Sequence, residues 1–404
     1  MSSRSNSPEL PAETPNPFRP TFGASPRFWA GRTVILEGFS EALDSPVGHP
    51  DRAMLISGTR GIGKTVLLTE LEDLAEARGW ISVRAIGSSG MAEHLIHTAI
   101  PTHIAKLNPQ AETRLKTLGI AGLGRVETEL DPRYGQLQPV PTVETRIRQL
   151  LEFTSGSGVF IAIDEVQDAP SEDLADVAQA FQNLIKDELP VALAFAGLTV
   201  GTRDLLDLPG TTFLRRASAY ELGPLTATDT VNLLAATAAG SGIHFGDAAA
   251  RRAAEASYGF PYLVQLIGAL AWKRTKDKAA ASQSARDSLT EDSSGELEVS
   301  VAVIDEILDE AIDTFGSQVH RPALRHVTDL QRDFLHSMAR LGGTEQSIGE
   351  IAQLLQRTTT GISRVRAALI KQEIIEPSSH GHVRFTQPYM AEHLLAEPRT
   401  RYVQ

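Results

Sequence analysis

The distribution of apolar positions divides the first half of the chain into short buried strands and amphipathic helices. Three apolar runs, residues 53–57, 159–163 and 191–196, lack the alternation of a half-exposed strand, so they suit strands covered on both faces. Apolar residues recur at helical spacing between them, as in residues 66–74 and 172–187. This order of elements predicts a parallel sheet with crossover helices. A further strand is expected at 80–85 and a further helix at 92–106.

Helical periodicity dominates the second half of the chain. Residues 226–278 are helical throughout in pattern, whereas 279–299 are rich in serine and poor in apolar residues, which is typical of a loop or flexible linker. Beyond this boundary, apolar spacing predicts amphipathic helices at 300–315 and 330–341. The chain is therefore expected to contain a core, a helical segment and a separate C-terminal domain.

The C-terminal domain has the pattern of a helix-turn-helix followed by a small hairpin. A short helix at 347–355, a turn at 358–360 and a longer helix at 361–370 make up the first part. Two strands around a loop follow within 374–385. This order of elements resembles a winged helix. Five segments are therefore expected along the chain: a disordered N-terminus at 1–16, a core at 17–225, a helical segment at 226–278, a linker at 279–299 and a helical and winged-helix domain at 300–404.

Composition excludes several functional classes. The chain has 404 residues, enough for two or three domains, and contains no cysteine, which excludes disulfides and thiolate metal sites. The first residues lack an apolar signal region, and no run approaches the roughly 18 apolar residues of a membrane span. We therefore expect a cytoplasmic protein without a membrane partner.

Charge is unevenly distributed along the chain. The net charge is −12, but residues 321–404 carry 11 Lys and Arg against 8 Asp and Glu, a balance of +3 that leaves −15 for the rest. The negative net charge argues against a protein that binds nucleic acid over most of its surface. The small positive charge of the C-terminal domain is compatible with a limited contact to nucleic acid.

A phosphate-binding loop lies directly after the strand at 53–57. A loop that wraps phosphates brings its backbone N–H groups close to the anion and then begins a helix, and glycines allow that approach. Lys64 is expected to reach the β and γ phosphates, and the Thr65 hydroxyl to coordinate the accompanying Mg²⁺. The complete loop consists of Gly58, Thr59, Arg60, Gly61, Ile62, Gly63, Lys64 and Thr65.

Two acidic residues end the strand at 159–163. Asp164 is expected on the metal or in its second shell, and Glu165 is expected to polarise the attacking water as general base. The alternative for this pair is a solvated strand end. Ligands of such sheets sit at the carboxyl ends of strands, so Thr199, just beyond the strand at 191–196, is a candidate contact for the γ phosphate or an ordinary loop threonine.

Together, these residues resemble the AAA+ and STAND P-loop ATPases, especially the bacterial and archaeal members related to the origin-recognition initiator clade. The resemblance covers about residues 17–404 and implies a three-layer α/β P-loop NTPase fold with a helical lid at 226–278 and a C-terminal winged helix. It also implies that Phe18, within the run Asn16-Pro17-Phe18, and Gly31 and Arg32 lie in the segment that packs around the adenine.

Three further site residues follow from the resemblance alone. Arg215 and Arg216 fall in the region that holds the arginine finger, which acts on a neighbouring subunit's nucleotide, although either could be a surface cation. Pro261, in Gly259-Phe260-Pro261, replaces the usual lid arginine; the STAND pattern implies that it backs the nucleotide, while a helix start with proline needs no ligand.

The sequence therefore predicts a Mg²⁺-dependent ATPase, and ATP is favoured over GTP because no guanine-reading motif is present. One alternative is a nucleotide-dependent switch or scaffold with little turnover, which meets a protein partner through the winged helix or through residues 117–141. Another is a DNA-binding initiator or transposition helper that uses Arg364, Arg366 and Arg384. A finger acting between subunits would require a nucleotide-dependent homo-oligomer.

Overall fold

The computed structural model describes residues 15–21, 28, 30–108, 140–286 and 297–396. Contacts group the chain into two units, residues 1–31 with 224–325 and residues 32–223 with 326–404. Most of the segment 117–141, considered above as a partner site, lies outside the described residues.

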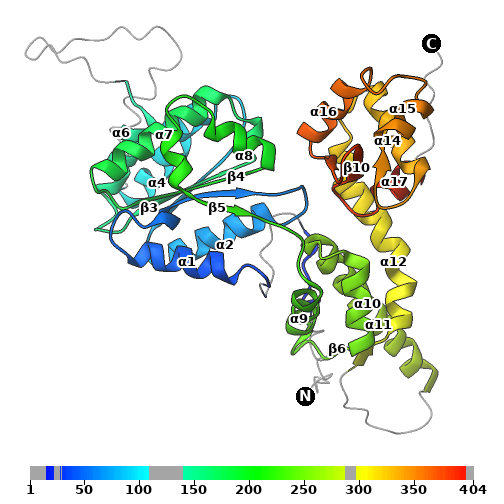
Figure 1. The fold of residues 1–404 in the computed structure, drawn as a ribbon. Helices are drawn as coiled ribbons and strands as arrows, with labels where there is room; N and C mark the ends of the chain where they lie inside the picture. Colours follow the sequence, from blue (N-terminus) through cyan, green and yellow to red (C-terminus); the bar gives the residue numbers. More distant parts are fainter. Residues whose placement is uncertain (1–14, 22–27, 29, 109–139, 287–296, 397–404) are drawn as a thin grey trace, which may run out of the picture. The chain divides into compact units, whose positions relative to one another are not determined.

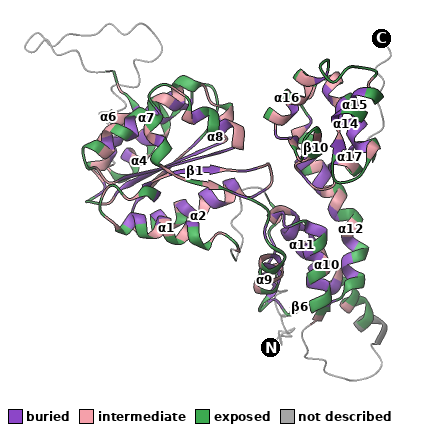
Figure 2. Ribbon diagram, in the orientation of Figure 1, coloured by how far each residue is buried: buried purple, intermediate pink, exposed green. Residues whose placement is uncertain are grey.

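A five-stranded parallel sheet forms the centre of the second unit, with strand order β2-β3-β4-β1-β5. Its strands are β1 (Ala53–Ser57), β2 (Ile81–Ile86), β3 (Val159–Asp164), β4 (Val191–Gly197) and β5 (Ser218–Glu221). Every residue of β3 and β4 is buried, as their uninterrupted apolar sequences predict (Figure 2). The predicted α/β P-loop fold is confirmed, and β5 is an addition that the apolar pattern did not reveal.

Helices cover both faces of the sheet (Figure 1). Alternate strand residues face opposite sides, so Phe160 packs on Phe39 of α1 (Thr33–Asp44) while Ile161 joins the cluster on the other face. The first face also carries α2 (Lys64–Ala77). The other face carries helices that pack through that cluster: α3 (Met91–His94), α4 (Ile100–Leu107), α6 (Val143–Leu151), α7 (Ser171–Lys186) and α8 (Thr199–Leu206).

The helix expected at 92–106 is interrupted by a π-helical turn. This turn, Leu95–Ala99, connects α3 to α4, and Pro101 follows it at the start of α4. A proline inside a helix lacks the N–H for an i to i−4 bond and clashes with the preceding turn. The wider turn accommodates this clash without ending the helix.

A C-terminal module, described over residues 326–396, completes the second unit. Its helices are α14 (Asp329–Leu341), α15 (Ile348–Leu354), α16 (Ser363–Lys371) and α17 (Met390–Ala396). Its strands β8 (Gln346–Ser347), β9 (Ile375–Pro377) and β10 (His382–Phe385) form an antiparallel sheet of order β8-β10-β9. The short helix, turn, longer helix and hairpin thus occur in the order expected from the sequence (Figure 1).

The first unit is mainly helical. It contains α9 (Ala227–Ala238), α10 (Asp247–Ser257), α11 (Pro261–Arg286), α12 (Val301–Phe315) and α13 (Arg321–Ala323), with a parallel pair of strands, β6 (Ile243–Phe245) and β7 (Leu297–Val299). Short helical turns elsewhere in the described residues include Pro50–Arg52, Val166–Asp168, Thr212–Arg216 and Gly316–His320.

The boundaries of this unit differ from those expected. The domain predicted at 300–404 is divided between the two units, because α12 buries Val303, Ile304 and Ile307 and packs against α10 and α11 of the first unit. The predicted linker at 279–299 is shortened at both ends, since α11 continues to Arg286 and β7 pairs with β6.

Candidate nucleotide-binding site

Gly58 to Gly63 form a compact loop between β1 and α2. Gly58, Gly61 and Gly63 have φ angles of 152°, 80° and 97°, which side chains rarely adopt. A Cβ atom on Gly58 would also lie 2.7 Å from the Leu222 carbonyl oxygen. The glycines allow the conformation of the loop, and the Ile62 side chain within it is buried.

Lys64 begins α2 and is buried within the loop that it follows. Its Nζ donates hydrogen bonds to the carbonyl oxygens of Gly58, at 2.7 Å, and Thr59, at 3.1 Å. Burial lowers the pKa of the ammonium, and the nearby carboxylates of Glu165, Glu373 and Asp164 oppose this effect. A buried cation at the start of a helix is suited to an anionic ligand.

Thr65 and Asp164 meet although they are 99 residues apart in the sequence. The Thr65 hydroxyl donates to Asp164 Oδ2 at 2.7 Å, and Asp164 is 4% exposed at the end of β3. A hydroxyl and a carboxylate are the hard oxygen ligands that Mg²⁺ prefers. The structure thus brings together the two residues that the sequence suggested as metal ligands.

Glu165 directly follows β3 in a left-handed backbone conformation, with φ of 53°. Its Oε2 accepts a hydrogen bond of 2.6 Å from Gln167 Nε2, while Gln167 Oε1 accepts one of 2.9 Å from the Leu198 backbone N–H. Gln167, which sequence reasoning missed, therefore connects the Glu165 carboxylate to the carboxyl end of β4. No motif signalled it, because its role depends on the adjacency of β3 and β4.

Arg84 is a second residue that sequence reasoning missed. It lies on β2, next to β3, and its guanidinium forms ion pairs with Asp164 Oδ2 at 3.4 Å and with Glu72 Oε2 at 3.2 Å. Burial raises the pKa of Glu72, and Arg84 opposes this rise. The available signal was a single charged residue in the otherwise uncharged strand β2.

We expect Arg84→Gln to lower the free energy of unfolding at pH 7 by about 1–2 kcal/mol, because it leaves two largely buried carboxylates without their cation. Without Arg84 the pKa of Glu72 in the folded state rises further above its ordinary value. The folded state then holds a proton that the unfolded chain releases, so the loss grows as pH rises above the ordinary carboxyl range.

Urea denaturation of both proteins at several pH values measures this effect. Arg78→Gln is the matched control, because its partner Asp44 is 66% exposed and the pair contributes little. An equal loss in both variants, or a loss independent of pH, would contradict the role assigned to Arg84.

The carboxyl end of β4 carries Thr199 as the first residue of α8. Thr199 is half-buried, and its neighbour Val200 donates its backbone N–H to Glu373 Oε1 at 3.1 Å. Glu373 belongs to the C-terminal module, and no sequence motif indicated it as a site residue. The expected γ-phosphate contact therefore lies beside a carboxylate from a distant part of the chain.

The residues expected around the adenine are divided between the two units. In the first unit, the Phe18 ring is buried against Phe245, with ring centroids 5.9 Å apart, so it serves the packing of that unit. Gly31 belongs to the same unit and Arg32 to the second, where its guanidinium donates to the Gly223 carbonyl oxygen at 2.6 Å. Adenine contact by these residues stays a prediction.

Pro261 begins α11 of the first unit. The preceding Gly259 has φ of 70°, and a Cβ there would lie 2.1 Å from the Leu225 carbonyl oxygen, so close backbone approach requires this glycine. The Gly259-Phe260-Pro261 sequence thus has a packing explanation beside the nucleotide contact that the resemblance implies.

The basic residues expected to act on partners are mostly exposed. Arg215 and Arg216 end the turn at Thr212–Arg216, and Arg215 pairs with Asp207 at 3.4 Å. Arg364 is exposed on α16, and Arg366 is half-buried. Arg384 on β10 donates to Glu376 at 2.6 Å, which occupies one side of its guanidinium.

No helix in the described part of the chain is long and apolar enough to cross a membrane.

Two family models match separate parts of the chain. Residues 29–193 match the model of an AAA ATPase domain, and residues 317–394 match a domain of unknown function (DUF8462). No curated protein shows significant similarity to the chain.

Two solved structures share the fold over nearly the whole chain. The Walker-type ATPase PABY2304 of Pyrococcus abyssi is 15% identical, with a TM-score of 0.56 over 91% of this chain and 96% of its own. The ORC2 protein of Aeropyrum pernix, solved as ADPNP and ADP complexes, is 14% identical, with a TM-score of 0.56 over 93% of this chain and 95% of its own. The chain therefore contains an AAA ATPase domain and has the P-loop fold of Walker-type and origin-recognition ATPases.

Proposed function

We propose that the protein binds ATP with Mg²⁺ at the loop between β1 and α2 and hydrolyses it. The observation that carries the proposal is the contact between Thr65 and Asp164 beside the buried Lys64, because it assembles hard oxygen ligands next to a phosphate-binding cation. The backbone N–H groups of residues 58–63 and the Lys64 ammonium hold the phosphates, and Thr65 and Asp164 hold the metal. Bound Mg²⁺ would neutralise charge on the transferred phosphoryl group.

Glu165 is the proposed general base. Its position directly after β3 places its carboxylate at the edge of the sheet where parallel strands present ligands. Gln167 holds this carboxylate at 2.6 Å, and Thr199 at the end of β4 is the proposed γ-phosphate contact. Arg215 or Arg216, exposed on the turn after α8, would act as a finger on the nucleotide of a second copy.

The helical unit and the C-terminal module also have proposed roles in nucleotide binding. The helical segment 226–278 is proposed to act as a lid, with Pro261 backing the nucleotide, and Phe18, Gly31 and Arg32 are proposed to lie in the segment that packs around the adenine. The C-terminal module is proposed to be a winged helix whose position depends on the nucleotide. Its contact with Val200, next to the proposed γ-phosphate residue, supports such coupling.

The direct test is nucleotide binding and phosphate release by the purified full chain, with ATP, ADP and GTP, in the presence and absence of Mg²⁺. We expect ATP to bind more tightly than GTP and Mg²⁺ to be required for turnover. Absence of nucleotide binding would overturn the proposal. Binding without phosphate release would leave the second candidate, a nucleotide-dependent switch with little turnover, which the docking of the C-terminal module favours.

A DNA-binding role has one supporting observation, the exposure of Arg364 on the second helix of the helix-turn-helix pattern. If the module binds duplex DNA, Arg364→Ala and Arg366→Ala are each expected to weaken binding about threefold to tenfold and to lower the salt dependence by about one phosphate contact. Titration of labelled duplex at several salt concentrations measures both.

Arg340→Ala provides the control, since it removes the same charge from an exposed position on α14. Duplex binding that none of these substitutions affects would exclude α16 as the contact. Equal losses in all three would indicate only a nonspecific charge effect.

A further inference from the structure

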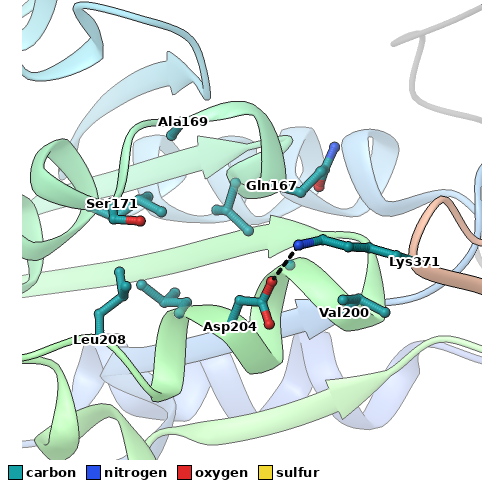
Figure 3. Close-up of a pocket in the computed structure, with 11 residues that line it drawn as sticks. Gln167, Ala169, Ser171, Val200, Asp204, Leu208 and Lys371 are labelled. Carbon is teal, nitrogen blue, oxygen red and sulfur yellow. Dashed lines mark ion pairs between the residues drawn. The ribbon is translucent and has the colours of Figure 1, made fainter. Parts of the chain in front are cut away.

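Several side chains of the C-terminal module contact the phosphate-binding edge of the core. Glu373 Oε1 accepts from the Val200 backbone N–H at 3.1 Å, and Gln387 Nε2 donates to the Arg60 carbonyl oxygen at 3.4 Å. Lys371 forms an ion pair with Asp204 of α8 at 3.6 Å, beside a small pocket (Figure 3). The module therefore touches both the phosphate loop and the end of β4.

The backbone fixes the position of Glu373 directly after α16. Glu373 has φ of 51°, and its N–H donates to the Ile370 carbonyl oxygen at 2.9 Å, which ends the helix. Its own carbonyl oxygen accepts from the Thr386 hydroxyl at 2.5 Å. A left-handed conformation is unusual for glutamate, so these bonds hold the residue in a place where glycine or asparagine is more common.

The Glu373 side chain is buried and only partly satisfied. The residue is 7% exposed, and Oε2 has no hydrogen-bond partner within the described residues. Burial raises the pKa of this carboxyl, while the hydrogen bond from Val200, the Lys64 ammonium and hydrogen bonds from Thr199 oppose the rise. A buried carboxylate with a free oxygen is costly, and its compensation comes from groups of the nucleotide site.

Those same groups are the ones that a γ phosphate requires. In the proposed site, Lys64 reaches the terminal phosphates and the residues after β4 contact the γ phosphate. The Glu373 carboxylate already accepts a hydrogen bond from the Val200 N–H and interacts electrostatically with the Lys64 ammonium. The Glu373 carboxylate and a γ phosphate cannot both use the Val200 N–H and the Lys64 ammonium without strong repulsion between the two anions. ADP has no γ phosphate and avoids this repulsion.

We propose that Glu373 determines the nucleotide preference of the site, because its carboxylate occupies the place of the γ phosphate and the docked module therefore admits ADP but opposes ATP. This inference rests on the proposed nucleotide binding. To bind, ATP would have to displace the Glu373 carboxylate from the Val200 N–H. The C-terminal module would then move away from the phosphate-binding edge of the core. Lys371 and Gln387 would release Asp204 and Arg60 in the same movement.

Glu373→Gln tests the proposal with little change of shape. Glutamine keeps an oxygen for the Val200 N–H and removes the negative charge. We expect the affinity for ATP to rise at least fivefold while the affinity for ADP stays within twofold, measured by displacement of a fluorescent nucleotide from the full chain in Mg²⁺. Glu376→Gln is the matched control, because it removes the same charge from β9, where its partner is Arg384.

The outcomes separate the two proposals. If wild-type protein binds neither nucleotide, the proposed function fails. If it binds both and Glu373→Gln leaves the ratio of ATP to ADP affinity unchanged, or if Glu376→Gln changes the ratio equally, only the role of Glu373 fails. An increase in ATP affinity confined to Glu373→Gln supports it.

A distance measurement tests the displacement of the module without altering Glu373. The chain contains no cysteine, so a double variant with Glu172→Cys on α7 and Gln353→Cys on α15, both exposed, can be spin-labelled specifically. We expect the same label distance without nucleotide and with ADP, and a longer or broader distribution with ATP. An identical distribution at saturating ATP and ADP would overturn the proposal.

Discussion

Lys64→Ala is expected to weaken binding of Mg-ATP about a hundredfold, the largest effect on affinity of any single substitution in the chain. The side chain supplies charge-assisted hydrogen bonds to phosphate, each of which contributes about 1.5–3 kcal/mol. Alanine also removes the hydrogen bonds that Nζ donates to Gly58 and Thr59, so the loop itself loses a support. Equilibrium titration with a fluorescent ATP analogue measures the loss.

Lys186→Ala is the control for charge, because Lys186 is exposed at the end of α7. A urea denaturation curve for Lys64→Ala distinguishes loss of the contact from loss of the fold. Retention of wild-type affinity in a folded Lys64→Ala protein would place the nucleotide elsewhere and remove the basis of the proposed function.

The largest expected effect on turnover comes from Glu165→Gln. A positioned general base contributes about 10²–10⁴ in rate, so phosphate release is expected to fall at least a hundredfold while ATP affinity changes less than threefold. Glutamine preserves the size of the side chain and can still bond to Gln167. Multiple-turnover and single-turnover phosphate release measure the rate, and a parallel titration measures affinity.

Glu172→Gln removes a similar charge from the exposed first turn of α7 and should leave turnover unchanged. Turnover that is equally slow in wild type and in Glu165→Gln would identify the protein as a switch. Turnover that is equally fast would assign the base to another residue.

The sequence predicted those parts of the site that lie on continuous segments. The phosphate loop is read directly from Gly58 to Thr65, and the apolar run before Asp164 predicts a buried strand that ends at the ligand edge of a parallel sheet. Spacing along the chain and strand order were enough here, because the loop and the strand end are each built from neighbouring residues.

The residues that the sequence did not predict act across segments. Arg84 matters because β2 pairs with β3, and Gln167 because β3 pairs with β4. Glu373 matters because the C-terminal module folds against the core, a contact between positions 173 residues apart. Periodicity says which residues are buried but not which distant segments become neighbours. The assignment of α12 to the helical unit was missed for the same reason.

The second unit is built from two separated parts of the chain, residues 32–223 and 326–404, and this has a consequence for biosynthesis. The ribosome produces the phosphate loop roughly 300 residues before Glu373, and at about 5–20 residues per second this interval lasts tens of seconds. During that time the newly made core can meet cellular ATP without the carboxylate that later opposes it. If Glu373 opposes ATP as proposed, the first nucleotide held by each molecule is selected by the core alone, and control by the C-terminal module begins only after that module has been synthesised.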